Sequence, residues 1–433
     1  MVQIKHINEL TPADLDKLFN RFGGDFSSIM TDTVVPIVKD VQENGDEAVK
    51  KYNAKFDGVS TESILAGEDE IEQGYKDTPK DVINAFMQAK ANIEEFHSHQ
   101  KRDTIMYTRD GFTLGIVYQP IERAAMYVPG GKASYPSSVL MGVVPAQIAG
   151  VEDITVITPP AKNGKVASAI LAACKILGVK NIIKAGGAQG IAAAGLGTQT
   201  VKKSDIIVGP GNIFVTAAKT YLFSLGLIQI DSLAGPSEVL IIADEHANPR
   251  WLAFDFLSQA EHEERARAVL VTTSAEVAAA VNEEIRKDIE SGCGRHEIKK
   301  TAVAASHIII ADTVEQAIDF SNKYAPEHME FAVENPLEYL HKIKNVGSLF
   351  LGNYAPVAVG DYFSGTNHIL PTGGAARFSS GTSVDTFLRR TTFQHLTPAA
   401  LKTAQEPVNI MSAVEGFADK HGGSVNIRFD TIE

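Results

Sequence analysis

The chain has 433 residues, nearly three times the ~150 residues of a typical domain, so we expect two or three folding units with well-formed cores. Hydrophobic residues make up 44% and charged residues 21%, which is ordinary for globular proteins and excludes a largely disordered or low-complexity chain. The 40 Lys and Arg residues against 53 Asp and Glu residues give a formal net charge of -13, which opposes non-specific binding to nucleic acid and to anionic membranes.

The first hundred residues are predicted to be mainly helical. Thr11 followed by Pro12 supplies a helix N-cap and a first-turn proline, and apolar residues recur at near-helical spacing through residues 11–56. The same pattern continues over residues 80–101, where we expect the apolar positions to face a core.

From about residue 112, short β-branched runs alternate with Ala-rich helical stretches. A first set of strands is predicted at residues 113–117, 153–158, 181–184 and 205–208, with helices at 137–149, 165–177 and 187–195. A second set of strands is predicted at 238–243, 268–273, 307–311 and 348–352, with helices at 249–262, 274–289 and 313–323. Alternation of this kind predicts βαβ units and mainly parallel sheets.

We therefore predict an α/β protein with two Rossmann-like parallel-sheet units, a helical N-terminal segment and a C-terminal arm. The expected boundaries are 1–25 for the N-terminal segment, 126–234 for the first α/β unit, 26–125 together with 235–375 for the second, and 376–433 for the arm. Within the arm, we expect no alternation of strands and helices before a short final strand at 425–429.

The two cysteines, Cys174 and Cys293, are too few for a disulfide framework or a Cys-rich zinc site, and they fit a reducing compartment. The N-terminus lacks the basic-then-apolar order of a signal peptide, and no apolar run approaches the ~20 residues that span a bilayer. We expect a cytoplasmic protein. Cys174 lies in an apolar helical run and Cys293 has no evident base beside it, so we expect no catalytic thiolate.

Several polar residues are candidate metal ligands. Gln259 and His262 are three residues apart on a predicted helix, so both project from one face and could reach one ion, although a polar helix surface would show the same pattern. Asp361 and His368 lie in a Gly-rich segment where function often sits, and loop polarity explains them equally well. Nitrogen and oxygen donors from a helix and distant loops would form a zinc site with an open position.

Glu327 and His328 are candidates for proton transfer. They follow Pro326, which interrupts any helix, so neither side chain is there for helix packing. A carboxylate beside an imidazole suits acid/base chemistry, because the imidazole titrates near neutral pH and the carboxylate can orient water.

Three glycine clusters, at residues 127–131, 185–190 and 208–212, each follow a predicted strand. Open parallel sheets bind ligands at the carboxyl ends of their strands, so these turns could hold a ligand by backbone groups. None of the clusters matches G-x-G-x-x-G, so a nucleotide would be held in a non-standard way. Tight turns without any ligand are the alternative.

Together these segments resemble the histidinol dehydrogenase family, the zinc enzymes that complete histidine biosynthesis. The resemblance extends from residue 121 to about residue 428, and the order of the motifs agrees as well as their content. The motifs are Tyr127-Val128-Pro129-Gly130-Gly131, Pro136-Ser137-Ser138-Val139-Leu140-Met141, Gly186-Gly187-Ala188-Gln189, Val208-Gly209-Pro210-Gly211-Asn212, Ala234-Gly235-Pro236-Ser237-Glu238-Val239, Ser258-Gln259-Ala260-Glu261-His262, Ala325-Pro326-Glu327-His328 and Ser364-Gly365-Thr366-Asn367-His368-Ile369-Leu370-Pro371-Thr372.

The resemblance implies a role for each candidate residue. Glu327 and His328 would be the catalytic acid/base pair. One zinc ion per subunit would be held by Gln259, His262, Asp361 and His421. NAD would be contacted by Tyr127, Gln189 and Asn212. The substrate would be contacted by Ser237, Gln259, His262, His328, Asp361, His368, Glu415 and His421.

The resemblance also implies a homodimer with shared active sites, because His421 lies in the arm and would enter the partner's site. Residues 126–234 would then be the NAD-binding domain, 26–125 with 235–375 would carry most zinc and catalytic residues, and 376–433 would be a dimerisation arm.

The implied activity is the NAD-dependent four-electron oxidation of L-histidinol to L-histidine through histidinaldehyde. One position departs from the family pattern, which has a substrate-binding Glu five residues before the arm's His: here that residue is Gly416, and the Glu is Glu415. Some relatives oxidise other small primary alcohols, including sulfonated propanediols, so such an alcohol is an alternative substrate. A zinc hydrolase and a non-catalytic zinc protein are further alternatives, but neither explains the three glycine turns.

Overall fold

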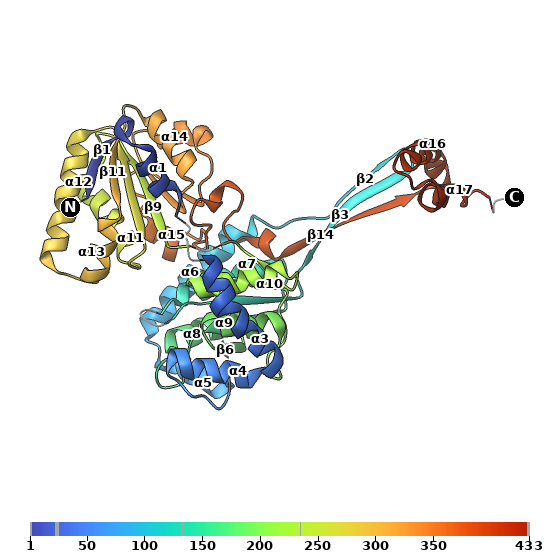
Figure 1. Ribbon diagram of the computed structural model, residues 1–433, viewed down its shortest axis with the longest axis horizontal. Helices are drawn as coiled ribbons and strands as arrows, with labels where there is room; N and C mark the ends of the chain where they lie inside the picture. Colours follow the sequence, from blue (N-terminus) through green and yellow to red (C-terminus); the bar gives the residue numbers. More distant parts are fainter. Residues whose placement is uncertain (1, 22–25, 131–133, 234, 431–433) are drawn as a thin grey trace. The chain divides into compact units, whose positions relative to one another are not determined.

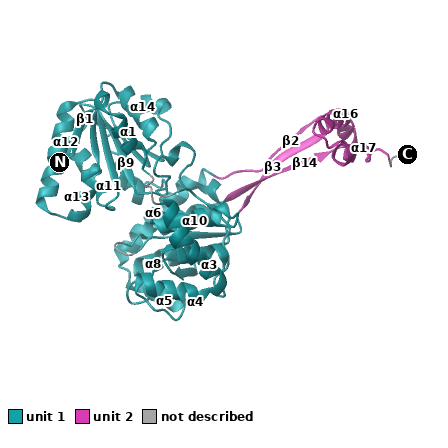
Figure 2. Ribbon diagram, viewed as in Figure 1, with its two compact units in different colours: residues 1–100, 121–387 teal, residues 101–120, 388–433 magenta. Residues whose placement is uncertain are grey.

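The computed structural model describes residues 2–21, 26–130, 134–233 and 235–430, and it divides into two compact units (Figure 2). Unit 1 comprises Met1–Gln100 with Ile121–Phe387, and unit 2 comprises Lys101–Pro120 with Leu388–Glu433. Unit 1 contains two parallel sheets and unit 2 a three-stranded antiparallel sheet, each described with its strands below. The predicted class, an α/β protein with two parallel-sheet units, is confirmed.

The first sheet of unit 1, which contains the strand labelled β6 in Figure 1, has the strand order β6-β5-β4-β7-β8. Every neighbouring pair is parallel. Its strands are β4 (Arg123–Tyr127), β5 (Asp153–Thr158), β6 (Asn181–Lys184), β7 (Ile206–Val208) and β8 (Gln229–Ile230). Because successive side chains of a strand point to opposite faces, Met126 joins one core cluster and Tyr127 the other. Both faces are therefore covered.

The helices on the two faces of this sheet come partly from the N-terminal hundred residues. One core contains residues of α5 (Glu68–Asp77), α6 (Lys80–Ser98), α7 (Pro136–Ala149) and α8 (Ser168–Ile176). The other contains residues of α3 (Val35–Asn44), α4 (Asp46–Tyr52), α9 (Gly187–Leu196) and α10 (Ile213–Ser224).

This packing corrects the expectation that residues 26–125 complete the second α/β unit. Ile71 of α5 and Ile93 of α6 are buried in the core of the first sheet, and residues 101–120 belong to unit 2. An apolar stripe predicts that a helix is buried on one side, but it does not identify the sheet that the stripe covers.

The second sheet has the order β1-β11-β10-β9-β12-β13, again parallel throughout. Its strands are β1 (Gln3–His6), β9 (Glu238–Ala243), β10 (Arg267–Thr272), β11 (His307–Ile310), β12 (His328–Ala332) and β13 (Ser348–Leu351). One core beside it contains residues of α11 (Pro249–Ala260), α12 (Ala275–Ser291) and α13 (His296–Ala304), and the other contains residues of α1 (Pro12–Phe19) and α14 (Val314–Tyr324).

The helical segment predicted over residues 1–25 contains α1, but strand β1 precedes this helix and was not predicted. Gln3 lies opposite His307, so β1 completes the sheet edge beside β11. A four-residue strand carries little sequence signal of its own, because its stability comes from pairing with a neighbour.

Unit 2 is built around the antiparallel sheet β14-β3-β2, followed by helices. Its elements are β2 (Ile105–Arg109), β3 (Phe112–Pro120), β14 (Leu388–Leu396), α16 (Pro398–Val414), the π-helical segment Ala418–Gly422 and α17 (Gly423–Asn426). The predicted strand at 113–117 thus lies in this sheet. The arm was expected at 376–433 with no alternation of strands and helices before its final strand, whereas β14 is followed there by α16.

The predicted final strand at 425–429 was wrong. Residues 423–426 form α17, and the backbone N–H of Ile427 donates to the carbonyl of Gly423 at 3.0 Å. Val425 is buried in unit 2. An alternating run forms a strand only where a neighbouring edge can pair with it, and this segment satisfies its backbone locally instead.

Across the described parts of the chain, no helix combines the length and apolar character needed to cross a bilayer.

Candidate active site

Helix α11 brings Gln259 and His262 together. The Asn248 side chain caps the start of the helix by accepting from the Arg250 N–H at 3.0 Å, and the helix ends at Ala260. His262 therefore lies just beyond the helix rather than within it. Gln259 is buried, and its Nε2 lies 3.3 Å from His262 Nδ1. The predicted pair is adjacent, with His262 partly exposed.

Strand β12 places Glu327 and His328 beside strand β9. Both side chains are buried. The backbone N–H of Glu238 donates to Glu327 Oε2 at 2.9 Å, and His328 Nδ1 lies 3.1 Å from the Glu238 carbonyl oxygen. A carbonyl only accepts hydrogen bonds, so Nδ1 carries a proton, and in the neutral ring Nε2 has the lone pair. His328 Nε2 is buried and has no hydrogen-bond partner within the described residues.

Two carboxylates act on the His328 ring. Glu327 Oε2 lies 3.5 Å from Nδ1, and Asp361 Oδ1 lies 3.8 Å from Nε2. Burial opposes the charged ring, but the negative charges of Glu327 and Asp361 outweigh it and raise the pKa of His328 to about 9. A cation beside Asp361 would oppose this attraction.

Asp361 and His368 connect the second sheet to helix α7. Asp361 lies in α15 (Val357–Tyr362), and its carbonyl accepts from His368 Nδ1 at 3.0 Å. His368 Nε2 in turn lies 3.3 Å from the Ser138 hydroxyl. Burial lowers the pKa of His368, which favours the neutral ring. Ser237, which directly precedes β9, accepts from the Arg267 N–H through its carbonyl at 3.1 Å.

A cleft of about 560 Å³ adjoins His262. This volume lies within the range of small-molecule sites, roughly 300–1,000 Å³. The cleft is lined by Ala85, Phe86, Ala89, Ser134, Tyr135, Pro136, Ser137, Leu140, Glu261, His262, Arg295 and Tyr362. The lining combines apolar side chains such as Phe86 and Leu140 with the charged Glu261 and Arg295 and the His262 imidazole, which suits a small polar substrate.

The donors present suit zinc. An amide oxygen from Gln259, an imidazole from His262 and a carboxylate from Asp361 are ligand types that Zn²⁺ accepts. Among the residues that the structure describes, no three His, Cys, Asp or Glu side chains are grouped closely enough to hold a metal. The expected ligand set includes a glutamine and a residue from outside unit 1, so it does not form such a group. The case for zinc therefore depends on the chemistry of the donors and on the contact between Gln259 and His262.

Comparison with known proteins decides the family. The family model described as histidinol dehydrogenase matches residues 23–429. The histidinol dehydrogenase of Methanocaldococcus jannaschii is 48% identical over 416 residues, which are 96% of each chain, and that of Leptospira biflexa is 47% identical over 92% of each chain. The crystal structure of histidinol dehydrogenase from Elizabethkingia anophelis matches with a TM-score of 0.93 and 37% identity, covering 100% of this chain and 98% of that one.

The chain belongs to the histidinol dehydrogenase family. It is therefore an oxidoreductase. The resemblance inferred from the motifs is confirmed over nearly the whole chain.

In this member of the histidinol dehydrogenase family, the side chain of Tyr127, from the first glycine cluster, reaches the second glycine turn, which contains Gln189. The Tyr127 hydroxyl accepts from the Gly187 N–H at 3.3 Å, and burial raises the pKa of Tyr127 to about 12, so the phenol stays protonated. Gln189 is buried, and its Nε2 donates to Asn53 Oδ1 at 3.3 Å. Gln189 Oε1 is buried with no partner in the described chain, so an acceptor is available there.

The third glycine turn is fixed by a buried ion pair. Gly209 has φ +113°, and a Cβ there would lie 2.2 Å from the Tyr127 carbonyl oxygen, so only glycine fits. Its N–H donates to Asp231 at 2.8 Å, and its carbonyl accepts from Lys219 Nζ at 3.0 Å. Lys219 and Asp231 are paired and buried. The turn that leads to Asn212 is therefore rigidly held.

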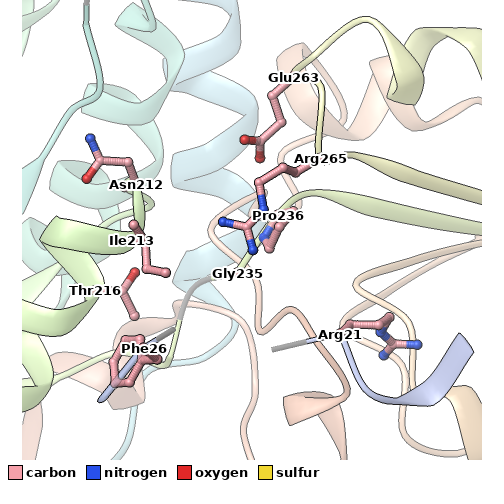
Figure 3. A pocket seen from close by; sticks show the side chains of 10 residues that line it. Arg21, Phe26, Asn212, Ile213, Thr216, Gly235, Pro236, Glu263 and Arg265 are labelled. Carbon is pink, nitrogen blue, oxygen red and sulfur yellow. The ribbon is translucent and has the colours of Figure 1, made fainter. Parts of the chain in front are cut away.

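Asn212 caps helix α10 and faces a small cavity. Its Oδ1 accepts from the N–H groups of Phe214 and Val215 at 3.1 and 3.2 Å. The cavity has a volume of about 200 Å³, and Figure 3 shows Asn212 and Thr216 on the opposite side from Glu263 and Arg265. The remaining lining residues are Arg21, Phe26, Gly211, Ile213, Gly235 and Pro236. The first glycine cluster extends into Gly131, which lies outside the described residues.

Glu415 and His421 lie in unit 2. Glu415 is the C-cap residue of α16, and His421 belongs to the π-helical segment Ala418–Gly422. Both are exposed, and the His421 ring lies 6.4 Å from the Phe417 ring. Unit 1 and unit 2 therefore each carry part of the predicted site.

No role was predicted for Glu238, although it lies in one of the motifs that carry the family resemblance. The Glu238 backbone contacts both Glu327 and His328. Burial raises the pKa of its own carboxyl to about 7, with the positive charge of Arg21 acting in the opposite direction. The position of Glu238 directly after Ser237 was the only sign of its role in the sequence, and nothing in the sequence indicated a role for Arg21.

Proposed function

We propose that this chain catalyses the NAD-dependent four-electron oxidation of L-histidinol to L-histidine, the last step of histidine biosynthesis, with one zinc ion per subunit. The observation that carries the proposal is the orientation of His328, whose Nδ1 donates to the Glu238 carbonyl while its buried Nε2 has no hydrogen-bond partner in the described chain. That orientation suits a general base. The substrate is proposed from the names of the relatives.

The proposed zinc ligands are Gln259, His262 and Asp361, together with the partner subunit's His421. Zinc would supply a non-redox cation that anchors the imidazole and amine of histidinol, and NAD would accept the two hydrides. Ser237, His368 and Glu415 are proposed to complete the substrate pocket. The neutral ring of His368 and the hydroxyl of Ser138, which lie 3.3 Å apart, support a polar wall there.

His328 and Glu327 carry out the proton transfers of successive steps. His328 Nε2 takes the hydroxyl proton as the first hydride leaves the carbon, and the aldehyde forms. Glu327 then takes a proton from water as the water oxygen adds to the aldehyde carbon, and the anion of the hydrate forms. This anion transfers the second hydride to NAD and becomes the carboxylic acid, which releases a proton to give the carboxylate. The burial of both side chains supports this scheme, because a site that excludes bulk water limits loss of the aldehyde.

We also propose that residues 126–234 bind NAD through Tyr127, Gln189 and Asn212. The unpartnered Oε1 of Gln189 and the rigid turn before Asn212 support this assignment. The glycine turns lie at the carboxyl ends of β4, β6 and β7, which is where an open parallel sheet binds its ligand.

We propose a homodimer with shared active sites, formed through the arm. Unit 2 exposes an unusual number of large apolar side chains for its size, which favours burial against another surface. These are Ile105, Met106, Tyr107, Ile410, Met411, Val414, Phe417 and Ile427. The net charge of -13 and the biosynthetic role favour a cytoplasmic enzyme that binds neither nucleic acid nor membranes.

Substrate preference tests this proposal. Purified protein supplied with zinc and NAD is expected to form NADH from L-histidinol at least about 100-fold more efficiently than from sulfopropanediol, because a pocket built for the imidazole loses its polar contacts with the other alcohol. NADH absorbance provides the measurement, and omitting zinc or substrate provides the controls. A preference for sulfopropanediol would indicate that the site, with Glu415 shifted by one position, recognises that alcohol instead of histidinol. No NADH from any alcohol would favour a zinc hydrolase or a non-catalytic zinc protein.

A further inference from the structure

Arg21, which follows α1, supports the segment that leads into the catalytic pair. Its side chain is only 6% exposed. Its Nη2 donates to the Tyr324 carbonyl at 2.7 Å and, more weakly, to the Ala325 carbonyl at 3.4 Å, and its guanidinium carbon lies 3.6 Å from the centre of the Tyr324 ring. These carbonyls end helix α14, where a cation is favourable.

The segment that Arg21 holds is strained. Ala325 has φ +54°, the left-handed region that residues with a side chain rarely adopt. Such a conformation persists only where surrounding contacts hold it. Glu327 follows two residues later, and His328 is next. The backbone direction at this turn therefore determines the position from which both side chains extend.

The Arg21 guanidinium also contacts Glu238, the residue whose backbone holds Glu327 and His328. Arg21 Nε lies 2.8 Å from Glu238 Oε2, and Glu238 Oε1 accepts from the Gly373 N–H at 3.1 Å. The Glu238 backbone is the group that binds Glu327 Oε2 and His328 Nδ1. One arginine therefore connects both backbone segments that orient the catalytic pair.

We propose that Arg21 is a positioning residue that sets the orientation of Glu327 and His328 through Glu238 and the Tyr324–Ala325 turn. This inference rests on the proposed function, in which these two side chains move protons. The geometry needs a planar fork that reaches two carbonyls, a carboxylate and an aromatic face at once, which a lysine ammonium cannot supply.

Kinetics of Arg21→Ala test the proposal against a matched control. Arg377 is exposed and donates to the carbonyl of Lys323, one residue before Tyr324. We expect Arg21→Ala to lower kcat by about 30-fold to 100-fold with KM for histidinol changed by less than about threefold, since a displacement near 1 Å costs on this order. Arg377→Ala should keep kcat within about twofold. Guanidinium ion should restore part of the lost rate, and methylammonium should not.

Crystal structures of the wild type and the variant provide the second measurement. The 2.9 Å contact between the Glu238 N–H and Glu327 Oε2 is expected in the wild type and lost in the variant. If Arg21→Ala does not fold, Arg21→Lys, which keeps the buried charge, is compared in the same way. An unchanged kcat or an unchanged Glu327 position would overturn the proposal. If the wild type does not oxidise histidinol, the proposed function fails, and the position of Glu327 alone then decides the role of Arg21.

Discussion

Replacing His262 by Ala is expected to lower zinc content and turnover together, the latter by more than about 100-fold, because loss of residues that only orient a metal ligand already costs 10-fold to 100-fold. The site offers few donors: Gln259 Nε2 lies 3.3 Å from His262 Nδ1, and Asp361 is the remaining ligand proposed within unit 1. Removing the single imidazole of this group leaves oxygen donors alone in unit 1, which bind zinc less well.

His246→Ala is the matched control, since this histidine is 59% exposed and lies outside the proposed site. Zinc per subunit is measured by atomic absorption, and turnover by NADH formation. The control should retain both. A His262→Ala protein that has lost its zinc yet keeps full activity would contradict the metal assignment.

The second large effect is recovery of activity in mixed dimers. His328→Ala and His421→Ala are each expected to be inactive, the first through loss of the base and the second through loss of a zinc ligand. If His421 completes the partner's site, a heterodimer has one site with both defects and one with neither. Random refolding makes half of the dimers heterodimers, so activity should return to about a quarter of wild type per subunit.

The controls are the two variants refolded separately, which should stay inactive, and wild type refolded in the same way. Native mass spectrometry measures the heterodimer fraction. Heterodimers without activity would place His328 and His421 in the same chain's site, because every site in the mixture would then retain one defect.

Seven strands of the two parallel sheets, β5, β6, β7, β9, β10, β11 and β13, were predictable because β-branched runs such as residues 238–243 are buried on both faces and leave a continuous apolar signal. Strands β4, β8 and β12 of these sheets were not predicted. Strand β1 and the packing of α5 and α6 were not predictable. Both depend on which surface the segment meets, and that information lies in residues far away along the chain. The helical conformation of residues 423–426 was not predicted for the same reason, because it depends on the surface that the segment meets.

The chemical groups of the site could be predicted from the sequence, but the residues that hold them in place could not. Gln259 and His262 are three residues apart and Glu327 and His328 are adjacent, so the residue types alone suggested that each pair acts together. Glu238 holds the catalytic pair through its backbone, which every residue type shares. Arg21 contacts the carbonyl of a residue 303 positions away, and no local pattern marks such a contact.

If one site oxidises histidinol to the acid in two steps, the ratio of NADH formed to histidinol consumed is two, and this ratio is the decisive measurement. Wild-type protein with limiting histidinol is expected to form two NADH for each histidinol, with histidine as the product and no free aldehyde, because each oxidation step transfers one hydride. NADH absorbance and chromatography of histidine are measured on the same sample. A ratio near one, with aldehyde accumulating in solution, would show that the site does not carry out the second oxidation.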